Sequence, residues 1–132
     1  MIESCAAPHA GVSLDPQCLD HTIWQMVGGN LEDAIFNWAS PLDWKVRLRI
    51  LRDASRGLLY LHTRTELKDV IFHRDVKPAN ILLNEQFDAK LSDVGLAAPS
   101  WQVQGAGRDI QGTLGYLEPE YMETGTFDVL TE

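Results

Sequence analysis

Cysteines and long apolar runs are both scarce in this sequence of 132 residues. The two cysteines, Cys5 and Cys18, have no second pair beside them, so neither a disulfide framework nor a zinc site is predicted, and two reduced thiols are expected. No apolar run approaches the roughly 18 residues that a membrane span needs, and the N-terminus lacks the basic flank and apolar stretch of a signal peptide. These absences predict a soluble cytoplasmic chain, or the intracellular part of a larger membrane-associated protein.

Positively charged residues are also few. The chain has 11 Lys and Arg residues against 19 Asp and Glu residues, a net charge of -8, which opposes the phosphate neutralisation on which nucleic-acid binding depends. A nucleic-acid partner is therefore not expected. Hydrophobic residues at 45% and charged residues at 23% are typical of a folded globular protein, and the length allows one domain or part of one.

The N-terminal part of the chain divides at a turn. Residues 1–21 mix prolines, glycine and small residues without periodicity, which predicts an irregular segment with no assigned role. Residues 22–27 are apolar enough for a short strand, and the Gly-Gly-Asn sequence at residues 28–30 predicts the turn that ends it. A short helix is expected over residues 31–38.

The clearest helix begins at Asp43, a good N-cap residue. Apolar residues recur along it at steps of three and four, which predicts that one face is buried; they are Trp44, Leu48, Leu51, Leu58 and Leu61, with Ala54 between them. Basic residues follow the same spacing on another face, at Lys45, Arg49, Arg52 and Arg56. That face is interpreted as solvated, with Asp53 placed to pair with Arg49, rather than as a patch for an anionic partner.

Residues with high β propensity return in the second half of the chain. Residues 70–72 predict a short strand, and residues 81–83 and 89–91 flank a turn that contains Asn and Asp, which predicts a small hairpin. The hairpin would hold residues 73–80 at one end of its two strands and Asp93 after the second strand. Polar groups from both places can then face one site.

The most specific pattern is the run His73-Arg74-Asp75-Val76-Lys77-Pro78-Ala79-Asn80, which is followed thirteen residues after Asn80 by Asp93-Val94-Gly95. A carboxylate such as that of Asp75 can orient a substrate hydroxyl and accept its proton. Asn80 and Asp93 offer the hard oxygen ligands that Mg²⁺ prefers, and Lys77 can stabilise negative charge on a transferred phosphate. His73 is expected to pack under the loop as a structural residue.

Three blocks in order resemble the protein kinase domain of the receptor-like and interleukin-receptor-associated group, over residues 22–132. They are Leu42-Asp43-Trp44 with Arg47-Leu48, Gly57-Leu58 and Tyr60-Leu61-His62; the run from His73 to Gly95; and Gly112-Thr113-Leu114-Gly115-Tyr116-Leu117-Glu118-Pro119-Glu120-Tyr121. The resemblance implies an α+β fold with small strands around a catalytic loop on a largely helical lobe. It covers the hinge end, the catalytic loop, the activation segment and part of that lobe.

The resemblance also implies a serine/threonine kinase that uses ATP and Mg²⁺ on a protein substrate, with an upstream receptor or adaptor as partner. In that comparison Asp75 accepts the proton, Lys77 contacts the γ-phosphate, and Asn80 and Asp93 bind Mg²⁺. Lys77 at its position is the variant found in serine/threonine kinases. Thr113 would line the substrate's entry beside Asp75.

Regulation is implied by two further positions. Arg74, directly before the catalytic Asp, implies control by a phosphate or an acid on the activation loop, because its guanidinium needs an anionic partner. Ser100 is the one free hydroxyl that stands out there as a phosphorylation site, while Asp109 is either a fixed negative charge for Arg74 or a solvated residue. The acid-rich end is expected to face solvent, with Glu118, Glu120, Glu123, Asp128 and Glu132.

The chain departs from the kinase pattern upstream and downstream. No Gly-x-Gly-x-x-Gly loop or strand Lys appears upstream, and the sequence given ends at Glu132, so the ATP-gripping strands of the small lobe and the later helices are expected to be absent. Val94 replaces the usual Phe, which is a secondary change. The expectation is a partial kinase domain; the alternatives are a non-catalytic kinase-like binding module and a truncated inactive product.

Overall fold

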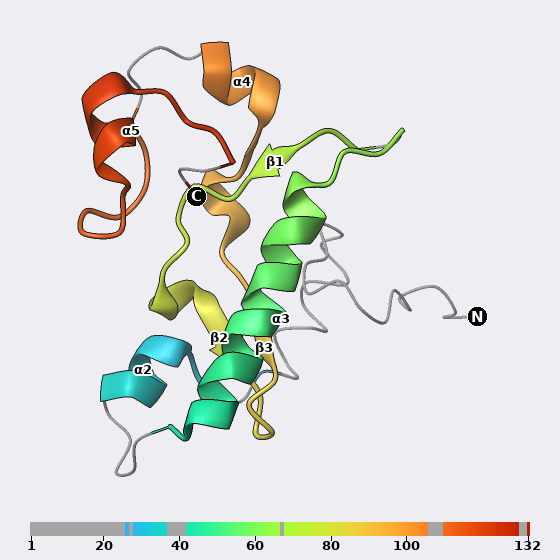
Figure 1. The fold of residues 1–132 in the computed structure, drawn as a ribbon, viewed down its shortest axis with the longest axis vertical. Helices are drawn as coiled ribbons and strands as arrows, with labels where there is room; N and C mark the ends of the chain where they lie inside the picture. Colours follow the sequence, from blue (N-terminus) through green and yellow to red (C-terminus); the bar gives the residue numbers. More distant parts are fainter. Residues whose placement is uncertain (1–25, 27, 37–41, 67, 106–109, 130–131) are drawn as a thin grey trace.

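The computed structural model describes the chain except for residues 1–25, 27, 37–41, 67, 106–109 and 130–131 (Figure 1). The elements follow in the order α2 (Leu31–Phe36), α3 (Trp44–His62), β1 (Ile71–Phe72), the 3₁₀ turn η1 (Pro78–Asn80), β2 (Ile81–Leu83), β3 (Ala89–Leu91), the 3₁₀ turn η2 (Val94–Leu96), β4 (Ala98–Pro99), α4 (Ser100–Gly105) and α5 (Pro119–Thr124). In Figure 1, α2, β2 and β3 lie along one end of α3, and α4 and α5 lie beyond its other end. No helix in the described part of the chain is long and apolar enough to cross a membrane.

The strands form two separate antiparallel pairs. The hairpin of β2 and β3 pairs Ile81 with Leu91 and Leu83 with Ala89, as the sequence predicts. The second pair joins β1 to β4, whose residues are far apart in the sequence, and sets Phe72 opposite Ala98. Helices with two small sheets confirm the α+β class.

The hairpin turn is built by side-chain hydrogen bonds. The side-chain oxygen of Asn84 accepts from the backbone nitrogens of Gln86 (3.0 Å) and Asp88 (2.8 Å), and the Asn84 amide donates to the Asp88 carboxylate at 3.0 Å. Such local bonds are the reason that Asn and Asp favour turns. They leave Phe87 in the left-handed region, at φ 62°.

The segment before α2 runs beside β2. The backbone nitrogen of Gly28 donates to Leu83 O at 2.9 Å, and Leu83 N donates to Gly29 O at 2.9 Å. A Cβ atom on Gly28 would lie 2.7 Å from Asn84 O, so only glycine fits this approach. Of the strand expected at residues 22–27, only Met26 is described, and it belongs to no strand; the segment 1–21, both cysteines and Asp109 lie outside the described residues.

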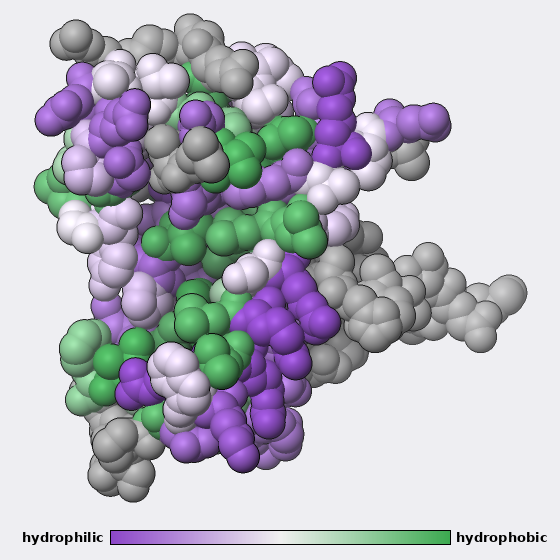
Figure 2. Space-filling model, viewed as in Figure 1, coloured by the Kyte–Doolittle hydropathy of each residue, from purple (hydrophilic) through white to green (hydrophobic). Residues whose placement is uncertain are grey.

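Helix α3 begins as expected, because the Asp43 carboxylate accepts from Lys45 N at 3.2 Å. The prediction of its buried face is wrong for three residues: Trp44 is 67% exposed, Leu48 48% and Leu51 56%. The buried face is Ile50, Ala54, Gly57 and Leu61, because β3 packs against that side. On the face shown in Figure 2, hydrophobic residues reach the surface over α3 beside a dense hydrophilic patch.

The basic residues of α3 are exposed, but their partners differ from the prediction. Asp53 pairs with Arg52 at 2.8 Å and Arg56 at 3.8 Å, and Arg49 donates instead to Gln86 O at 3.0 Å. Exposed pairs of this kind add little to stability. The neutralised Arg52 and Arg56 agree with a solvated face.

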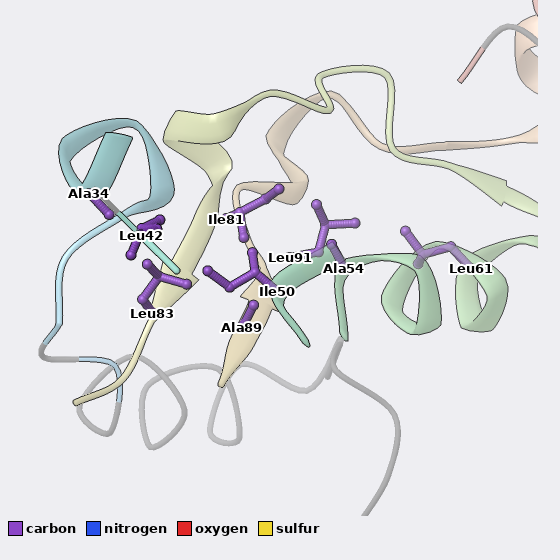
Figure 3. Packing of buried hydrophobic residues seen from close by; sticks show 9 residues of the cluster. All are labelled: Ala34, Leu42, Ile50, Ala54, Leu61, Ile81, Leu83, Ala89 and Leu91. Atoms are coloured by element: carbon purple, nitrogen blue, oxygen red, sulfur yellow. The ribbon is translucent and has the colours of Figure 1, made fainter. Parts of the chain in front are cut away.

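Two clusters of buried side chains hold the fold together. The first joins α2, α3 and the hairpin, and its members are Ala34, Leu42, Ile50, Ala54, Leu61, Ile81, Leu83, Ala89 and Leu91 (Figure 3). The second joins β1, β4, α4 and α5, and its members are Phe72, Ala98, Val103, Tyr121 and Phe127. Strand β1 connects them, because Ile71 packs against the first cluster and Phe72 lies in the second. The loop over residues 73–80 leaves β1 at this junction.

Candidate active site

The loop over residues 73–80 is anchored by a buried histidine. His73 is fully buried, as expected for a structural residue; its Nδ1 accepts from Asp75 N at 3.3 Å, so its Nε2 is the donor to Ser92 O at 2.8 Å. Arg74 has φ 70°, a left-handed conformation that costs a non-glycine residue about 1 kcal/mol or more. The turn at Arg74 directs the next residue, Asp75, into the site.

The Asp75 carboxylate is the centre of a polar cluster, and Asp75 itself is only 8% exposed. Its Oδ1 accepts from the Thr113 hydroxyl at 2.5 Å. Its Oδ2 accepts from Lys77 Nζ at 2.8 Å and from Asn80 Nδ2 at 2.9 Å. Residues from one loop thus meet Thr113, which lies 38 positions further along the chain.

Lys77 and Thr113 also contact each other. Lys77 Nζ donates to Thr113 Oγ1 at 2.7 Å, so the hydroxyl accepts from the ammonium while it donates to Asp75. Asn80 is fixed by a further bond from its Nδ2 to Asp75 O at 2.8 Å. The three side chains therefore hold the Asp75 carboxylate in one orientation.

The charges in this cluster stabilise each other. Burial by itself raises the pKa of Asp75, but hydrogen bonds from Lys77, Thr113 and Asn80, with the charge of Lys77, outweigh it and lower the pKa below its usual value. The hydrogen bond with Asp75 raises the pKa of Lys77, against some desolvation, and the negative charges of Asp75, Asp93 and Glu32 add to the rise. At neutral pH the pair is ionised, as an anion beside a cation.

Asp93 lies just after β3, in a left-handed turn at φ 60° and ψ 67°. Its carboxylate is exposed and accepts from Gly95 N at 3.4 Å. The preceding residue, Ser92, donates from both its backbone nitrogen (2.8 Å) and its hydroxyl (3.0 Å) to Asn80 O. These bonds tie the residue before Asp93 to the end of the catalytic loop.

Asn80 and Asp93 offer a donor set that fits Mg²⁺. Because Asn80 Nδ2 is committed to Asp75, the side-chain oxygen of Asn80 is the atom left to bind a cation. Asp93 adds an exposed carboxylate. Mg²⁺ typically takes one or two such ligands and fills its other positions with phosphates and water. Within the described residues no group of three or more His, Cys, Asp or Glu side chains is arranged to hold a metal ion.

A pocket opens beside the Asp75 carboxylate. Its walls include Val76, Tyr116, Leu117 and Phe127, and Thr113 and Asp75 lie at its polar side. Gly112, at φ 130°, passes directly against the catalytic loop, because a Cβ there would lie 2.7 Å from Arg74 O. The segment around Thr113 is therefore packed onto the loop.

Glu132 is a residue of the site that the sequence analysis missed. The acid-rich end was expected to face solvent, yet the Glu132 side chain is only 1% exposed. Its Oε1 accepts from Arg74 N at 2.5 Å, and its Oε2 lies 2.5 Å from His62 Nε2. One carboxylate thereby joins the catalytic loop to the end of α3. Composition carried no signal for this, since charged residues are rarely buried without partners that only the fold reveals.

Glu118 is the second exception in the acid-rich end. It is half-buried, and its carboxylate caps α5 by accepting from Tyr121 N at 2.9 Å. Glu120, Glu123 and Asp128 are exposed, as predicted.

Comparison with known proteins agrees with this geometry. The family model described as a protein kinase domain matches residues 23–130. The serine/threonine-protein kinase PCRK1 of Arabidopsis thaliana is 51% identical over 86 residues, which cover 64% of this chain and 20% of that protein. The serine/threonine-protein kinase PBL36 of the same plant is 45% identical over 102 residues, or 76% of this chain and 21% of that protein.

A third relative is the G-type lectin S-receptor-like serine/threonine-protein kinase At1g61490 of Arabidopsis thaliana. It is 43% identical over 106 residues, which cover 77% of this chain and 13% of that protein. The chain thus aligns with about a fifth or less of the length of these relatives. Protein kinases as a family use ATP and Mg²⁺ and act on proteins. With the family model matched over most of its length, the chain belongs to the protein kinase family, as part of a kinase domain with α+β fold.

Proposed function

We propose that this chain carries the catalytic loop and activation segment of a serine/threonine kinase that transfers the γ-phosphate of ATP to protein hydroxyls. The observation that carries the proposal is the cluster of Asp75, Lys77, Asn80 and Thr113 around one carboxylate. The Thr113 hydroxyl donates to Asp75 while it accepts from Lys77, and a substrate hydroxyl would make the same two contacts.

Each residue has a role that follows from its contacts. Asp75 would orient the substrate hydroxyl and take up its proton, because hydrogen bonds to Lys77 and Asn80 hold its carboxylate ionised and fixed. Lys77 would stabilise the charge on the transferred phosphoryl group. Asn80 and Asp93 would hold Mg²⁺, whose charge, when bound with ATP, neutralises the phosphates.

The experiment measures transfer of phosphate from radiolabelled ATP to myelin basic protein, with the full chain and its Asp75→Asn variant. We expect the variant to lose at least a hundredfold in rate, as is typical when a positioned electrostatic group is removed from a reacting centre. The matched control is Asp88→Asn, at an exposed carboxylate in the hairpin turn, which should leave the rate unchanged. Equal rates for wild type and Asp75→Asn would refute the role of Asp75.

Regulation and cellular context belong to the same proposal. Ser100 would be a phosphorylation site; its backbone nitrogen donates to Val70 O at 2.9 Å, so a phosphate there would add charge beside β1. An upstream receptor or adaptor and a cytoplasmic location, where ATP is supplied, complete the proposal. Mass spectrometry of the chain purified from the cells that express it would show whether Ser100 is modified, and a lack of phosphopeptides that contain Ser100 would contradict this part.

A second candidate is a non-catalytic kinase-like binding module. The exposed apolar residues Trp44, Leu48 and Leu51 favour it, because such surfaces mark interaction sites. Calorimetric titration with Mg-ATP separates the two. Micromolar affinity favours the kinase, whereas no heat of binding at millimolar Mg-ATP, together with no phosphate transfer, favours the binding module.

A further inference from the structure

Tyr121 joins α5 to the segment that leads into the site. It is only 2% exposed, and its hydroxyl accepts from Gln111 N at 3.0 Å. Its ring packs edge-on against Phe127, with 4.8 Å between ring centroids and 85° between planes. The Glu118 cap bonds to its backbone nitrogen. Packing and capping thus fix the ring and the backbone, so the hydroxyl is held beside Gln111 N.

Three consecutive residues are then held in turn. Gln111 is bound by the Tyr121 hydroxyl, Gly112 passes against the carbonyl of Arg74, and Thr113 donates to Asp75. Gly112 has φ 130°, a conformation that glycine adopts without strain and that other residues rarely adopt. The bond from Gln111 N to the Tyr121 hydroxyl holds the residue before Gly112 against α5.

We propose that the Tyr121 hydroxyl is a positioning group, which sets the Thr113 hydroxyl against Asp75 and Lys77 by holding the backbone of Gln111. Tyr121 would act on the cluster through the segment over residues 111–113. The inference deepens the proposed function and rests on it for its catalytic consequence, but the contact that it invokes can be measured without activity.

The bond to the Tyr121 hydroxyl favours the conformation in which the segment over residues 111–113 lies against the cluster around Asp75. A neutral backbone hydrogen bond in a buried site contributes about 1 kcal/mol, which corresponds to about fivefold in an equilibrium between held and released states. Because catalytic groups must be placed within a fraction of an ångström, released states transfer phosphate poorly. Removing the hydroxyl should therefore lower the rate without unfolding the chain.

The test uses Tyr121→Phe, which removes the hydroxyl and keeps the ring against Phe127. Its control is Tyr60→Phe, at a half-exposed tyrosine on α3 that lies under Lys68 and outside the site. Amide hydrogen exchange at Gln111, in the full chain, should be about fivefold faster in Tyr121→Phe and unchanged in Tyr60→Phe. Unchanged exchange at Gln111 in Tyr121→Phe would overturn the proposal.

A double-mutant cycle with Thr113→Ala tests whether Tyr121 acts through Thr113. In phosphate transfer to myelin basic protein, Tyr121→Phe should lower kcat about three- to tenfold in the wild-type background, with KM for ATP unchanged, and have little further effect in the Thr113→Ala background. Additive effects in the cycle would overturn the positioning role.

The same cycle can be read from urea unfolding if the wild-type chain transfers no phosphate. A lack of phosphate transfer would refute only the proposed function. Non-additive effects of Tyr121→Phe and Thr113→Ala on the free energy of unfolding would still support the contact between the two residues through the backbone, and additive effects would overturn it.

Discussion

Glu132→Ala is predicted to destabilise the chain strongly, because the change removes a buried carboxylate with two partners. The wild-type carboxylate is 1% exposed and serves two groups, the backbone nitrogen of Arg74 and the imidazole of His62. Removing the acceptor of a buried N–H costs about 1–3 kcal/mol, and losing the contact with His62 adds about 1 kcal/mol. The free energy of unfolding should therefore fall by about 2–4 kcal/mol, a large part of the stability of a small domain.

The assay is urea unfolding followed by circular dichroism and tryptophan fluorescence, with the slope against urea checked for constancy. Glu123→Ala is the matched control, because Glu123 is exposed on α5; it should change stability by no more than about 0.5 kcal/mol. Glu132→Gln keeps an oxygen that can accept from Arg74 N, and so should lose about half as much as Glu132→Ala. Equal unfolding free energies for Glu132→Ala and Glu123→Ala would refute the reasoning.

Three further changes follow from contacts described above. Because the pKa of Asp75 is lowered in the fold, its carboxylate stabilises the chain at pH values above the usual Asp pKa and loses this effect as pH falls through the lowered value. The difference in unfolding free energy between wild type and Asp75→Asn, measured by urea unfolding, should therefore be constant near neutral pH and shrink as pH falls below the usual Asp pKa. Gly28→Ala places a Cβ 2.7 Å from Asn84 O and should cost about 1–3 kcal/mol in the same assay, so an unchanged midpoint would contradict the close approach. Leu83→Ala, at a fully buried position, should cost about 2–5 kcal/mol, and a loss below about 1 kcal/mol would mean that the first cluster repacks.

The hairpin could be predicted from the sequence because its signals are local. Asn84 and Asp88 make their turn with bonds inside five residues, and the strands on either side pair in the only register that the turn allows. The N-cap at Asp43 is local for the same reason. Such features need no knowledge of what the segment packs against.

The buried face of α3 could not be predicted in this way. The predicted face combined Leu48 and Leu51, which are exposed, with Ala54 and Leu61, which are buried beside Ile50. Periodicity finds a broad apolar face, and only the position of β3 decides which side of it is buried in the described structure.

The candidate site also combines features with local sequence signals and features that depend on contacts between distant residues. Asp75, Lys77 and Asn80 lie within one loop, and their spacing predicts the chemistry without a structure. Thr113 was placed beside Asp75 through family resemblance, since no spacing rule relates residues 38 positions apart. Glu132 depends on a contact across 58 positions, for which neither spacing nor composition holds any signal.

The two clusters of buried side chains have a consequence for how the chain opens. Among the described residues, no buried residue belongs to both clusters. They are connected through β1, through the contact of His62 with Phe72, and through the bonds of Thr113 to the loop over residues 73–80. Clusters with separate cores can open with separate free energies, which amide exchange reports as separate levels of protection. The second unit, with Val103 and Tyr121, could therefore open and close while the hairpin that follows Asn80 keeps its hydrogen bonds. Such a division would let the activation segment respond to modification on its own timescale, at a free-energy cost well below that of global unfolding.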